Sequence, residues 1–160
     1  MIAALVWAAQ QPLDKRAFDS DYDDVELLGK LVTRGDGWPA AGLALHAGNG
    51  ALFGAVYSQL RPFVPGPPVL AGLAAGLAEH VAFWPLVSVI DRVHPARKDL
   101  PQLSGNGRAF LQAAWRHALF GAVVGGLEAL INDRSADEPP IPYSSNGHGS
   151  LEAAVSVAEV

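Results

Sequence analysis

The chain has 160 residues, of which 50% are hydrophobic and 17% charged, and its formal net charge is −5. A negative net charge argues against a nucleic-acid partner, because phosphate binding requires a basic face. The absence of cysteine excludes disulfides and cysteine-ligated zinc or iron–sulfur sites. The length is that of one domain, and long stretches almost free of charge with abundant glycine and alanine favour a membrane protein.

Residues 1–16, MIAALVWAAQQPLDKR, begin with an apolar stretch. About a dozen residues at 1.5 Å each would reach roughly 18 Å, which is too short to cross a hydrocarbon core of about 30 Å. A secretory signal would have basic residues before the apolar stretch, whereas Lys15 and Arg16 follow it. Two interpretations remain: a re-entrant or interfacial helix or, as we favour, the C-terminal half (about 1–13) of a span that begins upstream.

Residues 22–32, YDDVELLGKLV, form the second predicted element. Apolar residues recur there near helical spacing, at Val25, Leu28, Leu31 and Val32. Ser20 or Asp21 is placed to cap the start of this helix. The pattern predicts a short amphipathic helix that lies at the membrane surface.

Three further segments are long and apolar enough to cross a bilayer, which takes roughly 20 apolar residues. They are residues 38–60, 68–90 and 109–131. The Pro-rich turn 61–67 predicts that the first two full spans are antiparallel neighbours, and 91–108 is a polar loop. We therefore expect an all-α integral membrane bundle over 1–131, followed by a disordered polar tail over 132–160.

The distribution of lysine and arginine predicts the orientation. Loop 11–37 carries Lys15, Arg16, Lys30 and Arg34, and loop 91–108 carries Arg92, Arg97, Lys98 and Arg108. The 61–67 turn carries Arg61 alone. By the positive-inside rule, loops 11–37 and 91–108 face the cytoplasm of a bacterial inner membrane. The lipid bilayer is the expected surrounding, and a homo-oligomer or a membrane-protein partner stays open.

Each full span brings polar side chains to a glycine-lined helix face. The polar residues are His46, Asn49, Glu79, His80, Arg116 and His117. The glycines expected to let helices approach closely are Gly42, Gly50, Gly54, Gly72, Gly76, Gly121 and Gly125. Pro85 lacks an N–H group and predicts a kink just beyond Glu79 and His80.

The depths of these polar residues predict that they form one cluster. His46 and Arg116 precede the centres of two parallel spans by a similar distance, and Glu79 lies near the middle of the antiparallel one. An unpaired charge there costs between about 2.5 and more than 10 kcal/mol, so an ionised Glu79 needs a cationic partner. Arg116 is the predicted partner, because its guanidinium binds a carboxylate through two hydrogen bonds.

Three functional interpretations follow from the cluster. The first is proton- or solute-linked transport or membrane homeostasis, in which Glu79 titrates, the three histidines relay protons and Arg116 sets the resting protonation. The second is a structural or assembly role, in which polar contacts only fix helix partners. The third is a b-type haem held by His80 with His46 or His117. No other cofactor or metal is predicted, and no nucleophile elbow or catalytic triad suggests an enzyme.

Four stretches carry a resemblance to known proteins. They are LHAGNGALFGAVYSQL, LAEHVAFWP, DRVHPARKDLP and AWRHALFGAVVGGLEAL. In style they resemble small Gly/Ala-rich multi-span membrane proteins of high-GC bacteria, which are mostly uncharacterised. This resemblance implies an integral membrane bundle and brings no activity with it.

Overall fold

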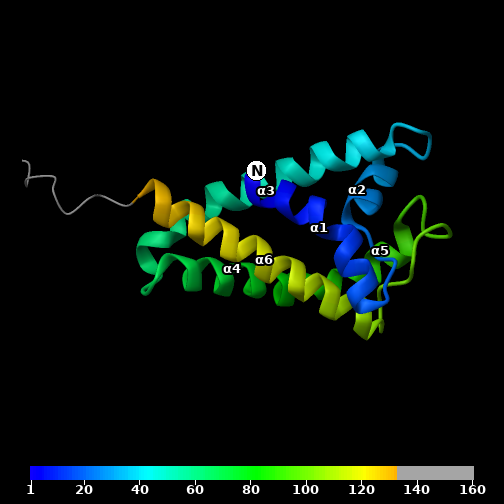
Figure 1. Ribbon diagram of the computed structural model, residues 1–160. Helices are drawn as coiled ribbons and strands as arrows, with labels where there is room; N and C mark the ends of the chain where they lie inside the picture. Colours follow the sequence, from blue (N-terminus) through cyan, green and yellow to red (C-terminus); the bar gives the residue numbers. More distant parts are fainter. Residues whose placement is uncertain (133–160) are drawn as a thin grey trace, which may run out of the picture.

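The computed structural model describes residues 1–132, and every regular element in that range is helical, which confirms the predicted all-α class. The helices are α1 (Ile2–Phe18), α2 (Asp24–Val32), α3 (Trp38–Leu60), α4 (Pro68–Phe83), α5 (Val87–Val93) and α6 (Gly107–Ile131), with 3₁₀ turns η1 (Arg61–Phe63) and η2 (Trp84–Leu86). The long helices α3, α4 and α6 run lengthwise through an elongated bundle, and α2, α5 and the loop after α5 gather at one end (Figure 1). The predicted disordered tail lies, from residue 133 on, outside the described residues.

Helix α1 is longer than its apolar stretch. It continues through Pro12 to Phe18 and ends at Asp19, whose φ of 48° is left-handed. The Gln-Gln-Pro segment and the charged residues after it are therefore helical, and they form one continuous helix with the apolar stretch. Asp14 lies on the inner face of α1 and is only 2% exposed. The start of α1 lies near the middle of the bundle's length (Figure 1).

Helix α2 is capped and packed differently from the prediction. Asp23, not Ser20 or Asp21, caps it, and its Oδ1 accepts the N–H of Glu26 at 2.9 Å. A Cβ added at Gly29 would lie 2.0 Å from the carbonyl oxygen of Trp38, so α2 lies directly on the first turns of α3. Gly42 makes the reciprocal approach to α2, and its close neighbour is thus not another long helix.

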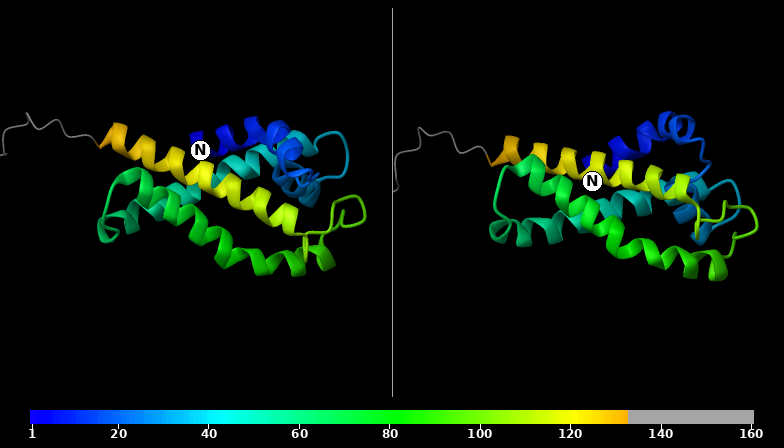
Figure 2. Two further views of the ribbon diagram at one scale, coloured as in Figure 1. Left: turned by 60° about the horizontal axis from the view of Figure 1, so that its bottom comes forward. Right: turned by 90° about the horizontal axis from the view of Figure 1, so that it is seen from below.

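Helices α4 and α6 pack backbone to backbone (Figure 2). A Cβ at Gly72 would lie 2.2 Å from the carbonyl oxygen of Gly121, and a Cβ at Gly76 would lie 2.4 Å from that of His117. Gly125 approaches the carbonyl oxygen of Pro68 equally closely. Small residues at these positions are what allow two helices to come so near.

Helices α3 and α4 are antiparallel, but they do not pack closely on each other. The first two full spans are therefore antiparallel as predicted but are not packed neighbours: α4 lies on α6, and α3 contacts α1 and α2. The turn between them is held by Arg61, whose Nη2 donates to the carbonyl oxygen of Gly66 at 2.9 Å. The separation of α3 from α4 leaves room for the cleft described below.

The helix that starts at Pro68 is interrupted at Pro85, as its missing N–H predicts. One 3₁₀ turn, η2, joins α4 to α5 there, and the Ser88 hydroxyl donates to the carbonyl oxygen of Pro85 at 2.9 Å. Pro68–Val93 is the one stretch of the described residues that is long and apolar enough to cross a membrane by length and composition. Within its most apolar 18 residues only 17% are buried, unlike the core helix of a globular protein.

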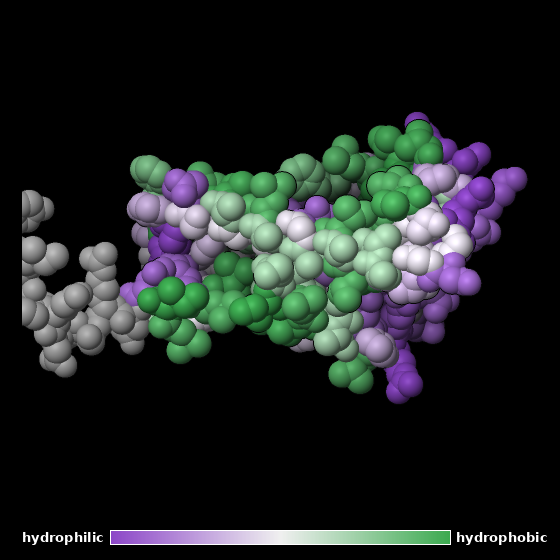
Figure 3. All heavy atoms as spheres, turned by 90° about the horizontal axis from the view of Figure 1, so that it is seen from above, coloured by the Kyte–Doolittle hydropathy of each residue, from purple (hydrophilic) through white to green (hydrophobic). Residues whose placement is uncertain are grey.

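The molecule buries polar side chains and exposes apolar ones. Arg116 and Gln112 are completely buried, whereas Leu52, Val81 and Phe83 are at least 60% exposed. Figure 3 shows one face of the bundle with hydrophobic residues along most of its length and hydrophilic residues gathered most densely at the end that holds α2 and α5. Apolar residues such as Trp7, Leu103 and Phe120 are buried as well, and an arginine is rarely buried unless it is paired.

Candidate functional site

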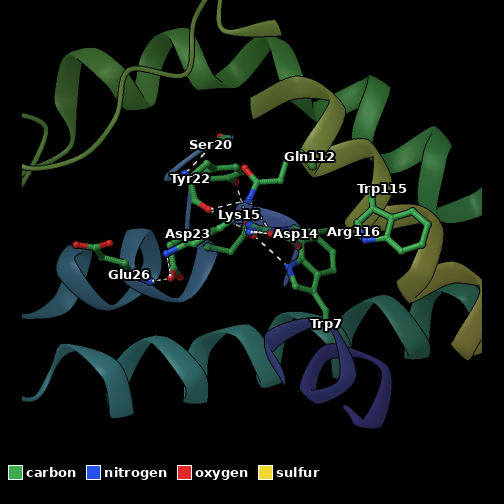
Figure 4. Close-up of polar contacts among 12 residues, drawn as sticks. Trp7, Asp14, Lys15, Ser20, Tyr22, Asp23, Glu26, Gln112, Trp115 and Arg116 are labelled. Carbon is green, nitrogen blue, oxygen red and sulfur yellow. Dashed lines mark hydrogen bonds and ion pairs between the residues drawn. The ribbon is translucent and has the colours of Figure 1, made fainter. Parts of the chain in front are cut away.

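Arg116 is the centre of a buried ion network and has no contact with Glu79. Its Nε and Nη2 donate to the two carboxylate oxygens of Asp14, each at 2.6 Å, and its Nη1 donates to Asp24 at 2.6 Å (Figure 4). The carbonyl oxygen of Tyr22 accepts a further bond from Nη2 at 3.0 Å. The predicted Glu79–Arg116 pair is therefore wrong, because the extension of α1 brings Asp14 to the guanidinium first.

Neutral side chains satisfy the remaining oxygens of the network. Gln112 donates to Asp14 at 2.7 Å, the Trp7 indole donates to Asp24 at 3.1 Å, and the Tyr22 hydroxyl also donates to Asp24. Burial, and after it the charge of Asp24, raises the pKa of Tyr22 well above its usual value, so its hydroxyl remains a donor. The network joins α1, α2 and α6. Helical periodicity of the apolar segments does not predict these contacts, because Asp14 and Asp24 lie outside those segments.

Five of the six predicted cluster residues line one cleft of about 230 Å³ between α3 and the α4–α5 helix, whereas Arg116 does not line it but bonds to Asp24, which does. The polar lining is Asp24, His46, Asn49, Glu79, His80 and His117. The aromatic lining is Trp7, Tyr22, Phe53, Phe83, Trp84 and Phe120. Asp24 is the functional candidate that sequence reasoning missed, and the only signal for it was its position at the start of a capped helix.

Glu79 and His117 form the protonatable pair of the cleft. His117 Nδ1 lies 2.8 Å from the carbonyl oxygen of Ala113, and since a carbonyl only accepts, this nitrogen carries a proton. The other ring nitrogen, Nε2, lies 4.0 Å from Glu79 Oε2. Nε2 is thus the nitrogen that could take up a further proton, and the two side chains attract each other when His117 carries that proton and Glu79 is ionised.

His46 and His80 are buried with free hydrogen-bonding capacity. They are 7% and 3% exposed, and within residues 1–132 neither Nε2 has a hydrogen-bond partner. The His80 ring lies 5.0 Å from that of His117, and the Trp7 ring lies 5.0 Å from His46 and 4.7 Å from His117. A buried polar atom without a partner costs about 1–3 kcal/mol, so these nitrogens are suited to meet a bound molecule or proton.

The haem alternative does not fit this arrangement. A porphyrin would have to enter between two histidine rings that ligate it from opposite faces. Trp7 lies between His46 and His117, and the rings of His80 and His117 already contact each other. Among the described residues no group of three or more His, Asp or Glu is arranged to hold a metal ion.

A second polar group lies towards the other end of the bundle. Glu128 accepts a hydrogen bond from the Tyr57 hydroxyl at 2.7 Å and pairs with Arg61 Nε at 2.6 Å. Phe53 stacks on Tyr57 and meets Phe120 edge to face, so aromatic rings separate this group from the cleft.

The two remaining glycines of α3 behave differently from each other. Gly50 faces Ala4 of α1, whose Cβ would lie 2.6 Å from a Cβ added at Gly50. Gly54 has open space around it, so its predicted packing role is wrong.

The site thus has two parts: a network in which every guanidinium nitrogen of Arg116 is hydrogen-bonded, and a cleft whose protonatable groups are incompletely paired. The first is suited to hold helices in place, and the second is suited to bind or to exchange a proton. Comparison with known proteins gives no family for the chain, because no family model, no curated protein and no solved structure matches it.

Proposed function

We propose that the protein is an integral protein of a bacterial inner membrane that carries out proton- or solute-linked transport through the cleft. Helices α3, α4–α5 and α6 form three spans, and α1 enters the bundle as a partial one. The observation that carries this proposal is the Glu79–His117 pair, a carboxylate and an imidazole 4.0 Å apart within a helical bundle. Ionisable groups at such positions mark proton and ion pathways.

The exposed apolar surface supports three spans. Helices α3 and α6 have 23 and 25 residues, and at 1.5 Å per residue each is at least about 34 Å long, enough for a hydrocarbon core of about 30 Å. Their glycines and polar residues lower their mean hydropathy, but many of these, among them Gly50, Gly121 and Gly125, face other helices. Lipid is the solvent that stabilises exposed Leu52 and Val81 together with a buried Arg116.

The topology is testable because the chain has no cysteine, so that a single introduced cysteine is labelled without background. We expect a membrane-impermeant maleimide to label Pro65→Cys, in the turn before α4, in right-side-out vesicles. Lys98→Cys, in the loop after α5, will react only after the vesicles are permeabilised, because positively charged loops face the cytoplasm. Labelling of Lys98→Cys in sealed vesicles, or recovery of the protein in the soluble fraction, contradicts the proposed topology.

Arg116 takes no part in the proposed transport step, because its charge is bound by Asp14 and Asp24. The proposed exchangeable proton moves between Glu79 and His117, and the ring of His80 lies 5.0 Å from that of His117. We expect Glu79→Gln to reduce proton flux into proteoliposomes at least tenfold, since glutamine retains the shape and loses the titration. The readout is a pH-sensitive dye inside the vesicles under an imposed pH gradient.

Glu26→Gln is the matched control, because Glu26 is paired with Lys30 at 2.6 Å on α2 and does not line the cleft. It will leave the flux unchanged, and both variants will have the thermal unfolding midpoint of the natural chain. Equal flux in Glu79→Gln and the natural chain refutes the proton pathway.

The second candidate function is a structural or assembly component, and the pairing of Arg116 with Asp14 and Asp24 favours it. In that case Glu79→Gln weakens the fold, and the natural chain carries no flux at all. The same vesicle experiment thus separates the two candidates.

A further inference from the structure

The cleft has an excess of negative charge. Among the described residues that line it, Asp24 and Glu79 are carboxylates and none is a lysine or arginine. Asp24 shares Arg116 with Asp14, so the network has two carboxylates for one guanidinium and keeps one net negative charge. In a site of low dielectric constant such an excess attracts a cation far more strongly than it would in water.

The shape and lining of the cleft select an organic cation. Its volume of about 230 Å³ is larger than the roughly 150 Å³ of a cavity that accepts benzene. Trp7, Phe83 and Trp84 contribute aromatic surface to its wall. The faces of such rings are negative and attract substituted ammonium groups, which need no ordered oxygen ligands.

The cleft is reachable from the side of the bundle. Helices α3 and α4 do not pack closely on each other along it. Asn49 of α3 and Phe83 of α4 are exposed where they line the cleft, and the Glu79 side chain is 37% exposed. His46 and His80, each more than nine-tenths buried, present nitrogens without partners in the same wall.

We infer that the cleft binds a small organic cation of the substituted-ammonium class at Glu79 in exchange for one proton from His117. Before binding, ionised Glu79 faces protonated His117. The arriving cation takes the place of the imidazolium charge, the His117 Nε2–H bond breaks, and its proton passes to water. His117 keeps its Nδ1 proton on the carbonyl oxygen of Ala113, and the net charge of the cleft is the same before and after.

This exchange deepens the proposed function, on which it rests, by naming the class of solute. The charged and titratable groups that face the pair are Asp24 from α2, His46 from α3 and His80 from α4. Arg116 does not line the cleft and is paired with two carboxylates. The His80 ring contacts the His117 ring, and two positively charged imidazoles at this distance would repel each other. Only one of the two histidines is therefore charged at a time, and one proton is released for each cation bound.

The test uses benzyltrimethylammonium and the purified full chain in nanodiscs, by calorimetry in two buffers of different ionisation enthalpy. We expect binding that releases about one proton and weakens up to tenfold for each unit of falling pH once His117 is protonated, because proton and cation binding are linked. Phenylmethanesulfonate has a similar apolar body and the opposite charge, and it will not bind. Equal binding of the two ions, or binding without proton release at every pH, overturns the inference.

Three variants locate the exchange. Glu79→Gln will weaken benzyltrimethylammonium binding at least tenfold, and Glu26→Gln will leave it unchanged. His117→Gln will bind the cation without releasing a proton; if this variant fails to fold, the pH dependence of the natural chain decides. Cation binding without proton flux in vesicles contradicts the proposed transport alone, whereas proton flux without cation binding contradicts only the choice of solute.

Discussion

Arg116→Gln will be among the most destabilising single substitutions in this chain. It removes the one guanidinium of a network in which Arg116 and Asp14 have side-chain exposures of 0% and 1%. Two carboxylates, Asp14 and Asp24, would then remain in a buried site without a cation. Removal of one partner from a buried ion pair costs about 3–5 kcal/mol, because the other charge is left uncompensated. We expect a loss of this size in the free energy of unfolding in mixed micelles.

The control for this prediction lies on the same helix. Arg108 pairs with Asp19 at the exposed start of α6, where the two side chains are 66% and 84% exposed. Surface pairs of this kind contribute about 0–1 kcal/mol, so Arg108→Gln will be nearly neutral. If both variants lose similar amounts of stability, the Arg116 network does not hold the bundle together.

A double-mutant cycle separates the pair from its surroundings. Asp14→Asn in the Arg116→Gln background removes one of the stranded carboxylates and will restore part of the lost stability. Residues in one ion network show coupling energies of about 0.5–3 kcal/mol, and we expect the Asp14–Arg116 pair at the upper end because its contact is bidentate. Strict additivity of the two substitutions would contradict the assigned contact.

Gly121→Ala will separate α4 from α6. The added Cβ would lie 2.2 Å from the carbonyl oxygen of Gly72, and a backbone atom cannot move aside as the end of a flexible side chain can. Overpacking typically costs about 1–3 kcal/mol, and a backbone clash belongs at or above that range. The measurement is the unfolding midpoint together with the elution volume of the protein in detergent.

Gly54→Ala is the matched control, because an added Cβ there meets nothing within 4 Å. In a helix, alanine is favoured over glycine by up to about 1 kcal/mol, so this variant will be neutral or slightly stabilised. The same chemical change is thus expected to act in opposite directions at two glycines of similar sequence context. Equal behaviour at both positions would show that close packing of α4 on α6 does not matter for stability.

The sequence by itself determined the local elements. The bounds 38–60 coincide with α3, because Pro39 favours a helix start and the Pro-rich turn after Leu60 ends it. The break at Pro85 follows from its missing N–H. Helical spacing also placed His46, Asn49 and Gly50 near one face of α3, and five of the six polar residues do line one cleft.

Only the tertiary structure decided which of these residues meet. Arg116 pairs with acids 92 and 102 positions away in the chain, and helical periodicity has no information on such distances. On charge alone, Glu79 was the expected partner of Arg116. Asp14 follows the apolar stretch in the sequence and therefore resembles the polar end of a span, but α1 continues past it. Likewise Gly42 and Gly54 look alike in sequence, yet one touches α2 and the other faces open space. The packing of the helices decides which side chains contact each other. It therefore also decides that Arg116 belongs to a structural network and that Glu79 and His117 belong to a protonatable cleft.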